Sequence, residues 1–256
     1  MDSNIQPIIY LDHFYDRYKD PDVDMCDIVE EIIESYRSGM DDMIAKQDYS
    51  NVLDFQYVKD KIIPVLVNRE KNKDMLENCV HKNFLDDLAV YYKIRINDNA
   101  HITVTNMIFS NYPVTEDVLH ETAINNVKDT YECENIIDMM MKMMGLNPAD
   151  EEAMKEMKAG MSAEECMYTV TTSNHLYGAA VMLNEEYMAA LSEKYGDIYI
   201  IPSSIHEILF ISATGDEEQE NFLRGTIQDV NETALDKEEY LSDHAYLYRK
   251  GIGFID

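Results

Sequence analysis

Two segments of the chain share a pattern that restricts the fold more than any other feature of the sequence. In residues 88–129 and in residues 197–235, two runs of β-branched and aromatic residues are joined by a short polar turn, and an amphipathic helical segment follows. Strands joined by a tight turn pair antiparallel, and the apolar side of a helix can cover one face of the hairpin. The pattern predicts an α+β fold in which antiparallel hairpins are packed against amphipathic helices. The two segments do not align side chain by side chain, so a true repeat is left open.

Local signals predict individual elements. LAVYYKIRI and HITVTNMIF are expected to pair across a polar turn at residues 97–99, and DIYIIPSSIHEILFI is expected to turn at Pro202. Thr115 is positioned to cap a helix, and apolar spacing predicts another helix over residues 24–38 that Gly39 ends. Four further stretches are predicted strands: IPVLVN, MYTVTT, YGAAVML and HAYLYRKGIGFI.

A methionine-rich stretch separates the two halves. Residues 136–161 alternate methionine with acidic residues and lysine, which is typical of one or two short helices. Their flexible apolar side chains most often pack on the rest of the protein, and the alternative is an adaptable binding surface. We therefore expect an N-terminal α+β lobe over residues 1–132, a Met-rich helical linker over residues 133–165, and a C-terminal α+β lobe over residues 166–256.

The net charge limits the partners. Asp and Glu number 50 against 21 Lys and Arg, a formal net charge of −29. Such a surface repels nucleic acid and anionic membranes, so we expect neither direct nucleic-acid binding nor membrane binding. The acidity is read first as a solvated surface. The alternative is an acidic decoy that binds a basic nucleic-acid-binding protein.

The four cysteines and the apolar pattern bear on the compartment. Cys26, Cys79, Cys133 and Cys166 lie far apart, without a zinc or thioredoxin-like spacing. The N-terminal stretch lacks a basic region followed by an apolar one, and no run of apolar residues is long enough to span a membrane. We expect reduced thiols and a cytoplasmic protein.

The Pro-Ser-Ser turn raises the question of catalysis. Ser204 and His206 could be neighbours on one side of a strand, and Asp243 could orient a histidine, so a serine hydrolase is one hypothesis. However, no G-x-S-x-G elbow and no glycine near either serine is present. A hairpin whose serine hydroxyls satisfy backbone groups explains more of these residues.

No metal or cofactor site is predicted. No histidine pair has the i, i+4 spacing of ligands on one helix face, and neither a Ca²⁺ loop nor a phosphate-binding glycine loop occurs. His81 beside Cys79 and His244 after Asp243 could become ligands if folding brought other groups to them.

Several segments together resemble a bacterial family of unknown function that is common in anaerobic gut bacteria. The resemblance runs from about Ile62 to the C-terminus, and its stretches include VTEDVLHETAINNVKD, LYGAAVMLNEEYMAALSEKYG and LSDHAYLY. A more distant similarity is to another uncharacterised cytosolic family. The resemblance implies an intracellular α+β protein and supplies no reaction, cofactor or catalytic residue.

Polar residues grouped within the resembling stretches are the candidates for a binding site. They are Asn68, Lys71 and Asn72; Asp86 and Asp87; Ser203, Ser204, His206 and Glu207; and Ser242, Asp243 and His244. The competing explanation for each group is ordinary turn and cap chemistry. The leading hypothesis is a non-enzymatic protein-interaction module for an unidentified partner, and a basic partner is one option. A hydrolase and an acidic decoy are the alternatives.

Overall fold

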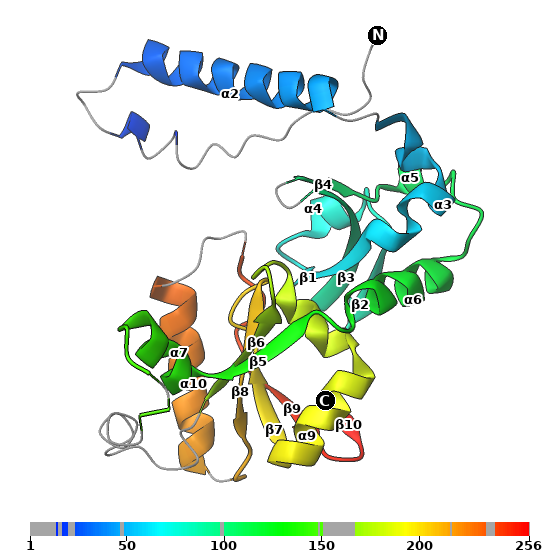
Figure 1. Cartoon of the computed structure of the whole chain (residues 1–256). Coiled ribbons are helices and arrows are strands. Elements are labelled where there is room, and N and C mark those ends of the chain that lie inside the picture. The colour runs from blue at the N-terminus through cyan, green and yellow to red at the C-terminus, as the bar shows by residue number, and fades with distance from the viewer. Residues whose placement is uncertain are drawn as a thin grey trace. The chain divides into compact units, whose positions relative to one another are not determined.

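A computed structural model describes residues 14, 17–19, 24–46, 49–97, 100–147, 149–150, 167–215, 217–233 and 239–255. The chain divides into two compact units, Met1–Asn51 and Val52–Asp256, which are described separately here (Figure 1). Helices and antiparallel sheets together make up the structure, so the predicted α+β class is confirmed. None of the helices in these ranges is both long and apolar enough to cross a membrane. The three-part division into two lobes and a linker stays a prediction.

The first unit contains α2, Met25–Lys46. The carboxylate of Asp24 accepts a hydrogen bond from the backbone N–H of Cys26 at 2.8 Å, which begins the helix. The prediction that Gly39 ends this helix is wrong, because the helix continues to Lys46. A glycine inside a helix costs only about 1 kcal/mol relative to alanine, and the residues that follow it favour the helix.

The smaller sheet of the second unit is antiparallel and has the strand order β1-β3-β2, with β4 also paired to β3. Its strands are β1 Ile62–Asn68, β2 His81–Phe84, β3 Leu88–Asn97 and β4 Ala100–Thr103. The predicted IPVLVN strand and the hairpin across residues 97–99 are thereby confirmed. All of β1 and the first half of β3 are buried, whereas β2 and β4 are only partly buried. The core of this sheet therefore lies along β1 and β3.

Short helices surround the smaller sheet, and the longest of them is α6. Thr115 caps it by accepting the N–H of Val118, and the helix buries Leu119 and Ala123 against the sheet, where it packs along β1. The bounds of these helices are η1 Tyr49–Leu53, α3 Phe55–Val58, η2 Lys59–Lys61, α4 Lys73–Leu76, α5 Asn106–Phe109 and α6 Glu116–Val127.

The larger sheet is also antiparallel, with the strand order β10-β9-β7-β8-β6-β5. Its strands are β5 Tyr131–Asn135, β6 Tyr168–Thr172, β7 Ile198–Ile201, β8 Glu207–Ser212, β9 Tyr246–Arg249 and β10 Gly253–Ile255. The predicted hairpin around Pro202 is confirmed as β7 and β8. HAYLYRKGIGFI forms two paired strands instead of one, because the chain turns at Gly251, which has a positive φ of 74°.

Two helices cover opposite faces of the larger sheet (Figure 1). On one face Leu223 and Ile227 of α10, Glu217–Thr233, pack against Ile201 and Ile211. On the other face Phe210 contacts Tyr195, which ends α9, Glu185–Tyr195. Residues 201 and 211 point away from residue 210 because successive side chains of a strand alternate between faces.

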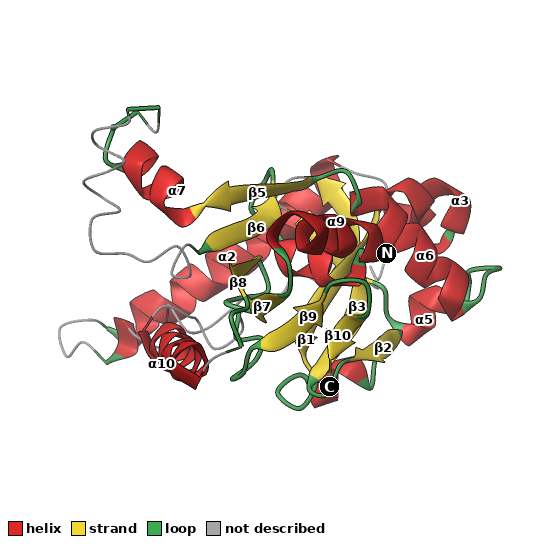
Figure 2. Cartoon of the chain, turned by 90° about the horizontal axis from the view of Figure 1, so that it is seen from below, coloured by secondary structure: helices red, strands yellow, loops and turns green. Residues whose placement is uncertain are grey.

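The remaining helices are η4, Gly178–Leu183, and α7, Ile136–Met143. YGAAVML was expected to be a strand, and this expectation is wrong, because Gly178–Leu183 is a fully buried 3₁₀ helix. The helix prediction for the methionine-rich stretch is confirmed at α7, which continues directly from β5 (Figure 2). Residues 148 and 151–161 of this stretch lie outside the described residues.

Candidate functional site

The last residue of β1 connects to the C-terminal segment of the chain. The side-chain amide of Asn68 donates to the carbonyl oxygen of Leu241 at 3.0 Å, across 173 positions of sequence. The Oδ1 of Asn68 accepts the N–H of Lys71 at 3.0 Å, and the Asn72 amide donates to the Asn68 carbonyl at 2.9 Å. The ammonium of Lys71 lies 3.0 Å from the ring centroid of Tyr240. Three of the predicted site residues therefore build one turn and hold residues 240–241 beside it.

Asp86 and Asp87 lie in the turn between β2 and β3. Arg69 holds this turn through its backbone and its side chain. Its backbone N–H donates to the Asp87 carbonyl at 2.8 Å, and its guanidinium donates to the Asp86 carbonyl at 2.5 Å. Leu85 takes a left-handed φ of 51°, which a bulky residue adopts only when its surroundings enforce it. The turn aims the Asp87 carboxylate at the C-terminal segment, where the hydroxyl of Tyr246 donates to it.

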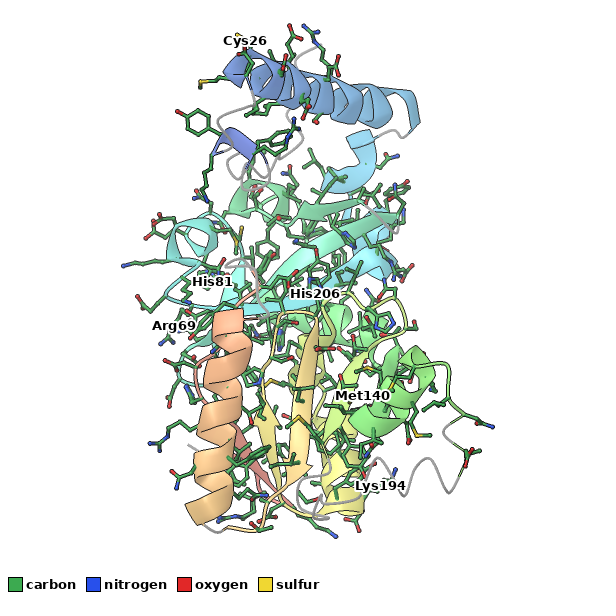
Figure 3. All side chains as sticks on the ribbon, turned by 90° about the vertical axis from the view of Figure 1, so that its left-hand side faces the viewer. Cys26, Arg69, His81, Met140, Lys194 and His206 are labelled. Atoms are coloured by element: carbon green, nitrogen blue, oxygen red, sulfur yellow. The ribbon has the colours of Figure 1, made fainter. Side chains whose placement is uncertain are left out.

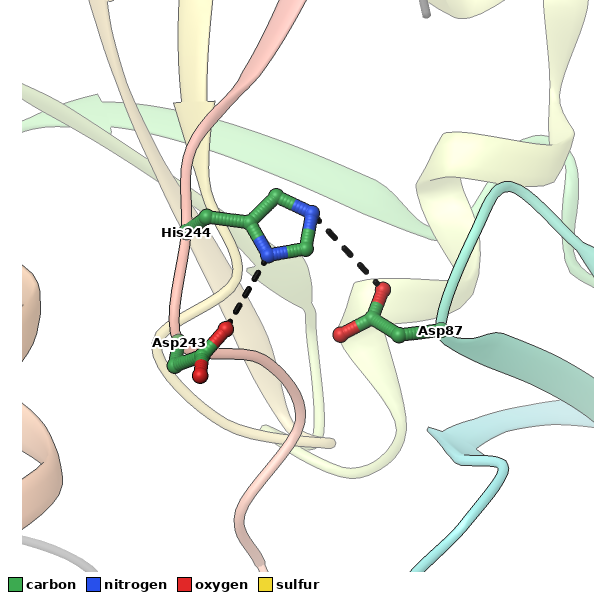
Figure 4. A group of neighbouring side chains, drawn as sticks. All are labelled: Asp87, Asp243 and His244. Atoms are coloured by element: carbon green, nitrogen blue, oxygen red, sulfur yellow. Dashed lines mark hydrogen bonds and ion pairs between the residues drawn. The ribbon is translucent and has the colours of Figure 1, made fainter.

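Asp87, Asp243 and His244 form a group that we call the carboxylate–histidine cluster (Figure 4). The imidazole lies between the two carboxylates, with Nδ1 at 3.1 Å from Asp243 and Nε2 at 3.9 Å from Asp87. One ligand atom from each of the three residues lies within 4.8 Å of the others. The Asp243 side chain is 78% exposed and that of Asp87 is 25% exposed, so the cluster opens to solvent on the Asp243 side.

Two buried residues support the cluster from behind. Ser242 Oγ accepts the His244 N–H at 3.3 Å and lies 3.2 Å from Nδ1 of His244 and 3.3 Å from the Tyr246 hydroxyl oxygen. Burial, with the hydrogen bond to Asp87 as a second cause, raises the pKa of Tyr246 well above its ordinary value. The phenol therefore stays protonated and remains a donor to Asp87. The cluster is pre-positioned by buried hydrogen bonds rather than by its exposed residues alone.

The hairpin group lies at the end of β7 and β8 that faces the smaller sheet (Figure 3). The Ser203 hydroxyl donates to the carboxylate of Glu207 at 3.4 Å, and Ser204 Oγ accepts the backbone N–H of His206 at 3.0 Å. Nδ1 of His206 accepts the N–H of Tyr177 at 3.2 Å, and Nε2 lies 3.6 Å from Glu239. Burial lowers the pKa of His206, while Glu239 opposes the shift.

Ser204, His206 and Asp243 do not form one hydrogen-bonded chain within the part of the molecule that the structure describes. Ser204 bonds to the backbone of His206, and the His206 ring is engaged by Tyr177 and Glu239. Asp243 pairs with His244. A serine nucleophile needs its base within hydrogen-bond reach, and this geometry does not supply it.

One family model, described as a family of unknown function (DUF5688), matches residues 1–250. The chain belongs to this family. The match confirms the resemblance to a family of unknown function and extends it toward the N-terminus. Neither the curated proteins nor the solved structures contain a match to the chain.

Sequence reasoning missed several residues that complete the site. Tyr240 and Tyr246 lie within a few positions of Asp243 and His244. A tyrosine near a predicted strand is typical of core packing, so neither residue gave a functional signal. Glu239 and Tyr177 reach His206 only through the fold. Cys79 and His81, the other pair considered as metal ligands, make different contacts. Nδ1 of His81 lies 3.0 Å from the carbonyl of Cys79, and the thiol of Cys79 is directed at Met75.

Proposed function

We propose that this protein is a non-enzymatic interaction module that docks a basic protein segment at the carboxylate–histidine cluster. The observation that carries the proposal is the pair of carboxylates, Asp87 and Asp243, held on either side of one imidazole at an exposed site. A lysine or arginine of a partner can bind two carboxylates that are already oriented with little further loss of side-chain entropy. The net charge of −29 favours the approach of a basic partner.

The buried support makes the cluster a better dock than the other acidic residues of the surface. Tyr246 and Ser242 are 6% and 1% exposed, and they orient the Asp87 carboxylate and the His244 ring before any partner arrives. An isolated surface carboxylate would lose side-chain freedom on binding, and such pairs contribute only about 0–1 kcal/mol. A partner that is itself a nucleic-acid-binding protein would make this module an acidic decoy.

The same geometry supports a second function, the binding of a divalent cation. Three side chains of the types that bind zinc and other transition metals each offer an atom within 4.8 Å of the others. The Tyr246 hydroxyl on Asp87 is the kind of outer hydrogen bond that orients a metal ligand. In this version the cation bridges the module to a carboxylate or histidine of the partner.

The compartment that we propose is the cytoplasm. Cys26, Cys79 and Cys133 are free thiols among the described residues, which fits a reducing environment.

Affinity purification of the tagged full chain, in low salt, in high salt and with a metal chelator, tests the proposal. We expect a stoichiometric partner that is lost in Asp243→Asn and retained in the control Glu186→Gln, which removes an exposed carboxylate of α9. Asp243 is largely exposed, so its replacement leaves the fold intact. Loss in high salt alone supports the basic partner, and loss with chelator supports the metal. A chain that purifies alone in every buffer, or a partner that Asp243→Asn retains in full, contradicts the proposal.

A further inference from the structure

A cavity of about 240 Å³ lies within the second unit, apart from the carboxylate–histidine cluster. Its walls come from β1, β3 and β4 of the smaller sheet, from the end of α6, and from β5, β6 and the loop between β6 and η4. Typical sites for drug-sized ligands span about 300–1,000 Å³, so this cavity suits a smaller molecule. Its polar lining residues include Arg95, His101, Thr130, Ser173, Asn174 and Tyr177.

The charge of the lining is opposite to that of the protein. None of the lining residues is Asp or Glu, although acidic residues outnumber basic ones by 50 to 21 in the chain. Arg95 supplies a cation at the wall, and no carboxylate of the described ranges forms an ion pair with it. A guanidinium that pairs with no carboxylate among the described residues, beside lining residues that include no acid, is a binding group for an oxyanion.

Neighbouring side chains leave further donors at the same wall. The Oδ1 of Asn174 accepts the Thr172 hydroxyl at 2.8 Å, which fixes the amide and leaves its NH₂ group without a partner among the residues described. The Tyr177 hydroxyl accepts the ammonium of Lys93 at 2.9 Å, so its own hydrogen is free to be donated. Lys93 also brings a second positive charge next to the cavity, at 4.7 Å from the Tyr177 ring.

Val127, at the end of α6, lines the cavity, and its carbonyl is already hydrogen-bonded. A helix C-terminus normally presents free carbonyls that repel an anion. Here the carbonyl of Val127, which lines the cavity, already accepts the N–H of Thr130 at 3.0 Å and its hydroxyl at 2.8 Å. Both acceptor positions of this carbonyl are therefore occupied.

The loop that forms the wall is held in a strained conformation. His175 and Tyr177 take left-handed φ angles of 56° and 57°, although neither is a glycine. Oγ1 of Thr172 closes the loop by accepting the N–H of Leu176 at 3.0 Å. Nitrogen Nδ1 of His206 anchors the Tyr177 N–H from the neighbouring turn. Strain that is maintained by such surroundings is typical of ligand sites.

From these observations we propose that the cavity binds a small organic oxyanion, a carboxylate or a phosphate monoester with a short apolar body. Arg95 binds the oxyanion head, with Asn174 and the Tyr177 hydroxyl as additional donors. The apolar body lies against Ile63, Pro64 and Leu176, which line the same cavity. This inference is independent of the docking function of the carboxylate–histidine cluster.

Isothermal titration of the full chain with butyrate and with butyl phosphate tests the inference, and inorganic phosphate probes the head alone. We expect saturable binding of at least one organic probe, and Arg95→Gln should weaken it about tenfold or more, since a hydrogen bond to a charged group is lost. The probe that binds more tightly identifies the head group.

The matched control is Arg224→Gln on α10, which removes an exposed arginine remote in sequence from the cavity lining. It should leave the dissociation constant within about twofold of the wild-type value. Arg95 is exposed, so its replacement should not alter the unfolding midpoint. Saturable binding that Arg95→Gln reduces and Arg224→Gln preserves supports the site. The inference is overturned if none of the three probes saturates up to about 10 mM, or if Arg95→Gln binds as well as wild type.

Discussion

Gly178 is the residue whose replacement should damage the fold most for the smallest chemical change. A Cβ atom at this position would lie 2.4 Å from the carbonyl oxygen of His206 and 2.6 Å from Cα of Thr171. The first atom belongs to the backbone of the turn before β8 and the second to the backbone of β6. Neither can move aside as the end of a flexible side chain would. The N–H of Gly178 also donates to the same His206 carbonyl at 2.9 Å. Gly178→Ala must therefore separate the start of η4 from the hairpin turn.

Two contributions set how much Gly178→Ala lowers the free energy of unfolding. Forcing one extra carbon into a well-packed site typically costs about 1–3 kcal/mol, and losing the hydrogen bond to His206 adds about 1 kcal/mol. We expect Gly178→Ala to lower the free energy of unfolding by about 3 kcal/mol, a large part of the roughly 5–15 kcal/mol that stabilises an ordinary domain. Displacement of His206 would also disturb its contacts with Tyr177 and Glu239.

Urea unfolding followed by far-ultraviolet circular dichroism measures the effect. The matched control is Gly225→Ala, since Gly225 lies inside α10 and a Cβ there meets nothing within 4 Å. This control should raise stability by about 0.5–1 kcal/mol, because alanine favours a helix interior over glycine. If Gly178→Ala unfolds within about 1 kcal/mol of wild type, the close approach of Gly178 to His206 and Thr171 is not a feature of the folded protein.

Two further predictions concern the hairpin turn. Burial lowers the pKa of His206 below its ordinary 6.5, so the unfolded chain takes up a proton there before the folded chain does. The free energy of unfolding should therefore fall as the pH drops below about 6.5. Unfolding midpoints between pH 7 and pH 5 should decline less steeply in His206→Asn than in wild type, and an equal slope would contradict the assignment. A fluorophosphonate probe should leave folded protein unlabelled, because Ser204 Oγ bonds to the His206 backbone rather than to its ring. Labelling that disappears in Ser204→Ala would instead support the hydrolase hypothesis.

Local chemistry explains which elements were predictable. Thr115 caps α6 through its own side chain, and β-branched residues on either side of a polar turn pair as β3 and β4. YGAAVML was misread because its composition suits a strand, while its conformation depends on the left-handed Tyr177 and on the packing of Gly178 against Thr171 and His206. Those contacts join η4 to β6 and to the turn before β8, so the pattern within residues 177–183 does not show them.

The candidate site was likewise predictable from the sequence only in part. The polar groups of the turns at residues 68–72, 86–87 and 242–244 were visible in the sequence as candidates. Their convergence was not, since the bond from Asn68 to Leu241 spans 173 positions and that from Tyr246 to Asp87 spans 159. The cavity beside Arg95 had no sequence signal, because its lining comes from both sheets.

By itself the sequence determined the α+β class, the antiparallel hairpins, the capped helices and the strongly negative charge, all of which depend on residues close together in the chain or on composition. Only the tertiary structure decided that His244 lies between Asp87 and Asp243, that Ser204 faces a backbone N–H, and that an acid-free cavity forms at Arg95. The physical reason is that these arrangements are set by how the sheets pack, which is determined by burial over the whole unit rather than by any short segment.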